Sequence, residues 1–116
     1  MALSIAFDNS QAVDTTEWSM PRDASYDSGQ TQTTLGVYQL LLDVSDMVTG
    51  DDLQIRVYEK VQSGGTQRIA YQANLVGPQS PPIFVLPSLI LGIGWDMTLD
   101  AISGTITVGW SIRKSA

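Results

Sequence analysis

The stretch LQIRVYEKVQSGGTQRIAYQANL, residues 53–75, decides the fold class of this chain of 116 residues. Apolar side chains occupy every second position before its two glycines, and the alternation resumes after them. A period of two residues is typical of strands that bury one face, and glycines between two such runs are typical of a hairpin. The sequence therefore predicts two antiparallel strands joined near Gly64 and Gly65.

The register of this hairpin depends on the length of its loop, because a slip of one residue exchanges the two faces of a strand. A two-residue loop would mix apolar and polar side chains on both faces. A three-residue loop from Ser63 to Gly65, with Gly65 in the left-handed conformation of a bulge, keeps one face apolar. That register pairs Leu53 with Leu75, Ile55 with Ala73 and Val57 with Tyr71 on the apolar face, and Arg56 with Gln72, Tyr58 with Ala70 and Lys60 with Arg68 on the other.

Three of the six basic residues of the chain, Arg56, Lys60 and Arg68, fall on this ribbon. Lys60 directly opposite Arg68 places like charges together, which is unfavourable unless an acidic group lies nearby. One interpretation is a solvated edge that its cations protect from aggregation, neutralised by this chain's own Asp43, Asp51 or Asp52. The other is a contact between these cations and the acidic surface of a neighbouring subunit.

The same alternation recurs along the rest of the chain, at residues 3–7, 16–20, 95–99 and 105–112. Residues 36–44 are apolar on both parities, which predicts a central strand covered on both faces. Residues 24–34 are polar and without a period, so we expect a long loop there. Pro87 restricts the apolar run around it to an edge strand or a bulge.

About eight short strands and no sustained helical period predict an all-β fold. We expect one domain over residues 1–116, an antiparallel β-sandwich of jelly-roll or Greek-key type. Its two ends, residues 1–8 and 112–116, are candidate arms that could exchange with a neighbouring molecule.

Composition excludes several classes of function. Twelve acidic residues against six basic ones give a net charge of -6, which argues against binding nucleic acid or anionic membranes through overall charge. The apolar run from Ile83 to Trp95 is shorter than the ~20 residues of a membrane helix. The beginning of the chain lacks the basic segment of a signal peptide, so we expect a protein without a classical export signal.

The sequence offers little catalytic chemistry, because it has no histidine and no cysteine. The usual general base and the commonest metal ligand are therefore missing, and we expect no enzyme activity and no cofactor. Four aspartates could supply oxygen ligands for calcium, but they lack the EF-hand spacing and are also ordinary turn residues. They are Asp43, Asp46, Asp51 and Asp52. Trp95 and Trp110 lie in phase with apolar neighbours, which favours the core over a sugar-stacking platform.

Two segments, Gly36–Arg68 and Trp95–Ala116, resemble small virion-associated proteins of tailed bacteriophages. The resemblance implies a capsid decoration or cement protein, made in the host cytoplasm, that binds the outside of the major capsid shell as a homo-oligomer, with a trimer favoured. Candidate contact residues for the major capsid protein are Arg56, Lys60, Arg68, Arg113 and Lys114. Two alternatives stay open: a carbohydrate-binding or host-adhesion module, and a tail or head–tail connector component.

Overall fold

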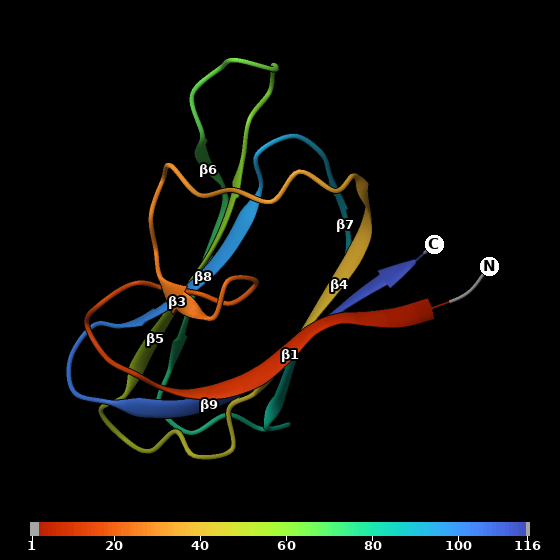
Figure 1. Cartoon of the computed structure of the whole chain (residues 1–116). Coiled ribbons are helices and arrows are strands. Elements are labelled where there is room, and N and C mark those ends of the chain that lie inside the picture. Colours follow the sequence, from red (N-terminus) through yellow and green to blue (C-terminus); the bar gives the residue numbers. More distant parts are fainter. Residues whose placement is uncertain (1–2, 116) are drawn as a thin grey trace.

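The computed structural model describes residues 3–115, with side chains from residue 4 onward, and this part of the chain forms nine strands in two antiparallel sheets (Figure 1). The first sheet has the order β1 (Leu3–Val13), β9 (Ile106–Ser115), β4 (Gly36–Asp43) and β7 (Ile83–Leu91). The second has the order β3 (Ala24–Ser25), β2 (Trp18–Ser19), β8 (Asp96–Ala101), β5 (Asp52–Glu59) and β6 (Arg68–Val76). The prediction of an all-β antiparallel sandwich is confirmed.

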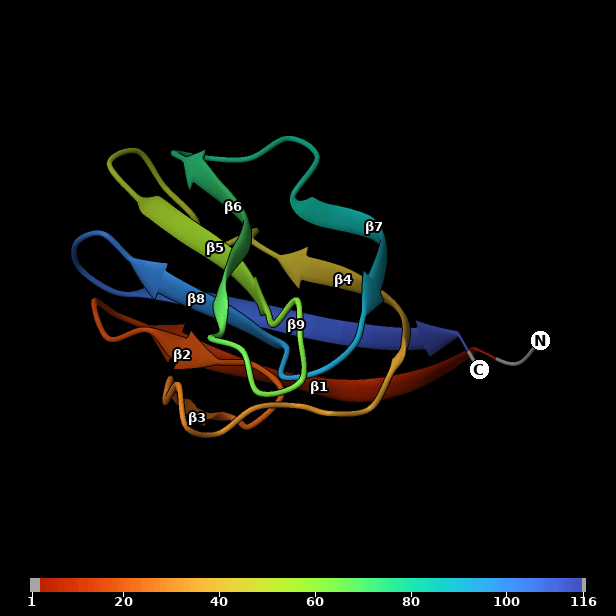
Figure 2. The same cartoon turned by 90° about the horizontal axis from the view of Figure 1, so that it is seen from above.

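Viewed from above, the chain crosses between the two sheets repeatedly, and the two ends of its described part lie side by side (Figure 2). β1 pairs with β9 along almost its whole length, from Leu3 opposite Ser115 to Val13 opposite Ile106. The candidate arms are thus paired strands over residues 3–8 and 112–115, while residues 1, 2 and 116 lie outside the described part. Their use in exchange between molecules stays a prediction.

The core lies between the sheets and is built from the inward parity of each strand. β4 contributes Tyr38, Leu40 and Leu42, and Trp95 is fully buried beside Tyr38 with their ring centroids 4.6 Å apart. Burying one such apolar side chain contributes about 1.5–3 kcal/mol to stability. On β5, β8 and β9 the apolar residues that alternation placed in the core are buried, whereas Ile5 on β1 and Ile69 and Tyr71 on β6 are exposed although alternation placed them on the apolar face.

The prediction that residues 36–44 are covered on both faces is wrong for the isolated chain. Leu40 and Leu42 point into the core, whereas Val37 is 40% exposed and Leu41 is only half-buried. β4 lies between two strands of its own sheet, but the second sheet covers only one side of it. The outer side of this apolar strand is left open.

The hairpin follows the predicted register over most of its length, with Leu53 opposite Leu75 and Arg56 opposite Gln72. A bulge between Val57 and Tyr58 then shifts the pairing, so that Tyr58 lies opposite Ile69 and Glu59 opposite Arg68. The predicted pairs Tyr58–Ala70 and Lys60–Arg68 are therefore wrong. Lys60 lies beyond the end of β5.

The connection is also longer than predicted, since residues 60–67 lie between the two strands. A turn closes it, in which the Gly65 N–H donates to the Gln62 carbonyl at 2.9 Å. Gly64, rather than Gly65, takes the left-handed conformation, with a φ of 86°. The bulge, and not the loop, therefore sets the pairing next to the connection, where it differs by one residue from the predicted register.

The long loop after β3 packs against the second sheet. The Tyr26 ring stacks on Tyr58 with centroids 4.6 Å apart, and its hydroxyl donates to Gln67 at 2.6 Å. Further along, Gln32 and Trp95 form a backbone bridge. The outer face of the second sheet is therefore covered by its own chain around Tyr58, whereas Ile69 and Tyr71 of β6 are 49% and 40% exposed.

Candidate functional site

The outer side of the first sheet exposes a group of large apolar side chains, which we call the open face. Ile5, Val85 and Ile90 are 59%, 45% and 85% exposed, on strands β1 and β7. Two further apolar side chains of this face, Val37 and Leu41, lie on β4, between β1 and β7 in the sheet. The open face consists of Ile5, Val37, Leu41, Ile83, Val85 and Ile90. Val37 lies opposite Ile90 and Leu41 opposite Val85, so exposed apolar side chains adjoin one another across β4 and β7, and such a group marks a site of interaction with another molecule. Ile5 is separated from them by Arg113 and Gln39.

Strand register arranges the open face in rows that cross the sheet. The central row is Asp8, Ser111, Leu41 and Val85. Two residues away along the strands, the hollow row is Ser10, Gly109, Asp43 and Ile83. On the other side of the central row, the arginine row is Ile5, Arg113 and Gln39.

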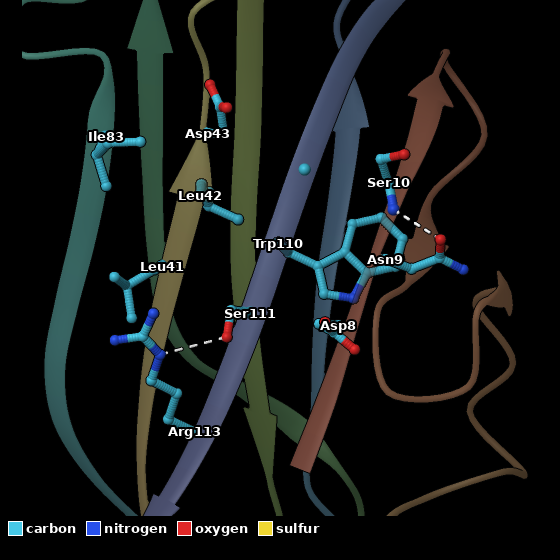
Figure 3. A pocket seen from close by; sticks show the side chains of 11 residues that line it. Asp8, Asn9, Ser10, Leu41, Leu42, Asp43, Ile83, Trp110, Ser111 and Arg113 are labelled. Carbon is cyan, nitrogen blue, oxygen red and sulfur yellow. Dashed lines mark hydrogen bonds between the residues drawn. The ribbon is translucent and has the colours of Figure 1, made fainter. Parts of the chain in front are cut away.

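A shallow hollow of roughly 510 Å³ lies over the hollow row and most of the central row, and Arg113 also lines it (Figure 3). Its floor is Gly109, where an added side-chain carbon would lie 3.6 Å from Cβ of Asp43. The hollow exists because residue 109 faces outward from the sheet and, as a glycine, carries no side chain. The backbone N–H and the hydroxyl of Ser45 both donate to the Asp43 carboxylate, and these bonds lower its pKa.

The Arg113 guanidinium also lies on this face. Its Nε donates to the Ser111 hydroxyl at 3.4 Å, a long hydrogen bond that Figure 3 marks with a dashed line. A cation and a carboxylate thus lie on opposite sides of the central row, on one apolar surface. Sequence reasoning selected Arg113 but missed the hollow, because the absent side chain of Gly109 gives no signal by itself.

The ribbon cation Arg56 is neutralised within its own chain. Its Nη1 lies 3.3 Å from Glu17 and 3.8 Å from Asp100, and its Nη2 donates to Gln54 at 2.6 Å. The neutralising carboxylates are therefore Glu17 and Asp100 rather than the expected Asp43, Asp51 or Asp52. A role for Arg56 in partner contact stays a prediction.

The other candidate cations fall into two groups. Lys60 and Arg68 lie at the end of the hairpin, and no ion pair involves either of them within residues 3–115. The Lys60 stem packs across Gly94, where an added side-chain carbon would lie 2.6 Å from it. Arg113 and Lys114 lie on β9 in the other sheet.

Two carboxylates beside the β2–β3 segment, the half-buried Glu17 and the buried Asp96, were missed from the sequence. Glu17 accepts hydrogen bonds from the Tyr58 hydroxyl at 2.6 Å and from the Thr98 hydroxyl. Asp96 is fully buried; one of its oxygens accepts from the Ser19 hydroxyl at 2.8 Å, and the other has no hydrogen-bond partner in the described part of the chain. Burial raises the pKa of Asp96 to about 6.

Two other candidate sites resolve into structural roles. Trp95 and Trp110 are buried, as their phase predicted. Asp43 and Asp51 accept hydrogen bonds from residues of their own turns, and among residues 3–115 no three acidic side chains are grouped to hold a metal ion. The described residues also contain no helix that is long and apolar enough to span a membrane.

Comparison with known proteins gives a distant structural likeness. No family model matches the chain, and no curated protein matches it. Among solved structures, it is similar to a pentameric capsid protein isolated from metagenomic phage sequences, at 17% sequence identity and a TM-score of 0.45. The match covers 98% of this chain and 65% of that protein, so the chain spans less than two thirds of its length.

Proposed function

We propose that this protein is a structural component of a bacteriophage particle and acts by binding alone. The observation that carries the proposal is the open face, because the second sheet covers only the inner side of the first. An apolar surface with large residues such as Ile90 at 85% exposure is suited to contact with another protein. The sequence resemblance to virion-associated phage proteins supports the particle as the place of that contact.

In its finer form, the proposal is a capsid decoration protein that binds the outside of the major capsid shell and joins its subunits. Lys60 and Arg68, at the end of the hairpin and without an ion pair in the described residues, are the cations that we assign to contact with an acidic shell. Charge complementarity of this kind guides association and fixes orientation. No catalytic step is part of the proposal.

Binding to shells tests this function directly. The purified protein is mixed with expanded and unexpanded capsid shells of the phage that encodes it, and bound protein is counted after sedimentation. We expect saturable, stoichiometric addition to expanded shells and a higher temperature of shell disruption. The double variant Lys60→Gln/Arg68→Gln should bind more weakly, whereas Ser103→Glu/Thr105→Glu, with the same change in net charge, should bind normally.

Two results would contradict the proposal. Failure to add to either form of shell would remove the decoration function. A stable ring of six or twelve subunits with no affinity for shells would favour a head–tail connector component instead.

A further inference from the structure

We propose that the open face is the contact between two copies of this chain, related by a twofold axis that lies along the central row. The inference rests on the proposed function, because it names the partner of the surface on which that function depends. A twofold contact uses the same patch of both molecules, so the patch must be complementary to itself. Within the three rows, Arg113 and Asp43 supply opposite charges on the two sides of the axis, and Leu41 and Val85 lie on it.

The geometry follows from the register of β9. Ser111 lies in the central row, with Gly109 and Arg113 two residues away on either side. An axis along the central row exchanges these two directions, so Arg113 of one copy lies over Gly109 of the other. Both positions are on the outward parity of the same strand, and two residues span about 6.6 Å.

Charge and shape agree at this position. The hollow over Gly109 is open, and the Asp43 carboxylate lies at its side with two hydrogen bonds from Ser45 that favour its ionised form. A guanidinium from the second copy can enter the hollow and pair with this carboxylate. It gives up only the 3.4 Å bond from Arg113 to Ser111. Because the axis is twofold, this pairing of Arg113 with Asp43 forms twice, once from each copy.

The apolar residues complete the match. Leu41 and Val85 lie on the axis row, so each meets its own copy across the interface. Asp8 lies in the same row at the edge strand β1 and is exposed, so its like-charge contact is screened by solvent.

The size of the face sets the strength expected of the contact. Four strands at ~4.8 Å spacing and ~8 residues of length at ~3.3 Å each give roughly 500 Å² for each copy. The total of roughly 1,000 Å² is near the lower bound for a specific interface. We therefore expect dimers that form and dissociate with concentration.

Cross-linking tests the axis itself. The chain has no cysteine, so Ser111→Cys introduces one thiol on the axis, where its copy lies about one sheet-to-sheet distance of ~10 Å away. A bismaleimide of that length should convert the protein to covalent dimers. Thr107→Cys is the matched control on the same strand and parity. It lies four residues from the axis, so its two copies are ~26 Å apart along the sheet and should not be joined.

Sedimentation equilibrium over a range of concentrations tests the chemistry. Arg113→Glu should raise the dimer dissociation constant about tenfold or more, because two ion pairs become like-charge contacts. Val85→Glu should also weaken the dimer, whereas the same change at Val61, which is 97% exposed on the hairpin loop, should not. Unchanged circular dichroism and unfolding temperature would confirm that each variant is folded.

The results separate this inference from the proposed function. A protein that stays monomeric or forms trimers, or that cross-links equally at positions 107 and 111, overturns the twofold contact. If such a protein still adds to shells, the decoration function stands and the open face belongs to the shell. Dimers that cross-link at position 111 but ignore shells support the contact and refute the function.

Discussion

Replacing Asp96 with asparagine should change how the stability of this protein depends on pH. Burial raises the Asp96 pKa from 3.8 to about 6. The folded state therefore holds the proton more tightly than the unfolded state, and stability falls as pH rises from about 4 through about 6. At one pKa unit per 1.36 kcal/mol, the full effect is about 3 kcal/mol. The stability is present below the unfolded pKa and lost above the folded one.

The variant isolates this effect from the other carboxylates. The asparagine side chain introduced by Asp96→Asn keeps an oxygen for the hydrogen bonds from Ser19 and Met97 but does not titrate. Relative to this variant, the native protein should gain about 2 kcal/mol of unfolding free energy between pH 7.5 and pH 4.5. Urea titrations at the two pH values, followed by tryptophan fluorescence, measure the difference. Asp46→Asn, the same change at an exposed position, is the matched control.

The reasoning fails if native protein and Asp96→Asn lose or gain stability in parallel between pH 7.5 and pH 4.5. Parallel curves would mean that the Asp96 carboxylate has the same pKa in both states. Water or a cation would then have to reach the Asp96 carboxylate and stabilise its charged form, which contradicts its burial.

Two further changes test the packing of the core and the polar layer, by which we mean the hydrogen-bonded and ion-paired group of Glu17, Tyr58 and Arg56. Leu40→Ala should lower the unfolding free energy by about 2–5 kcal/mol, because it opens a cavity in the core. The same change at the half-buried Leu41 should lower it clearly less. Equal losses in urea titrations would contradict the assignment of inner and outer faces. Glu17→Gln should cost about 1–3 kcal/mol, because the carboxylate receives the Tyr58 hydroxyl and pairs with Arg56. A cost as small as that of the exposed Asp46→Asn would show that the polar layer is not coupled to folding.

The sequence predicted most of the fold because side-chain alternation reports directly on which face of a strand is buried. The pairing of Leu53 with Leu75 followed from that rule combined with a three-residue loop, and it holds although the connection is longer. The bulge at Tyr58 was not predicted, because alternation carries no signal for a single extra residue on one strand, and Tyr26, which stacks on that ring, comes from a loop far away in sequence. Contacts between distant segments also decided that Glu17 neutralises Arg56.

Residues 36–44 and 83–91 show why the candidate site was harder to predict than the fold. Apolar side chains on both parities indicate that both faces of a strand are covered, but they do not say whether the cover belongs to the same chain. In this chain only the inner parity, such as Leu40, is covered. The outer parity carries the same apolar signal together with Asp43 on β4 and, on the neighbouring β9, the exposed Arg113 and the side-chain-free Gly109. A carboxylate, a guanidinium and a hollow, spaced evenly about an apolar row, fit a cover supplied by another molecule.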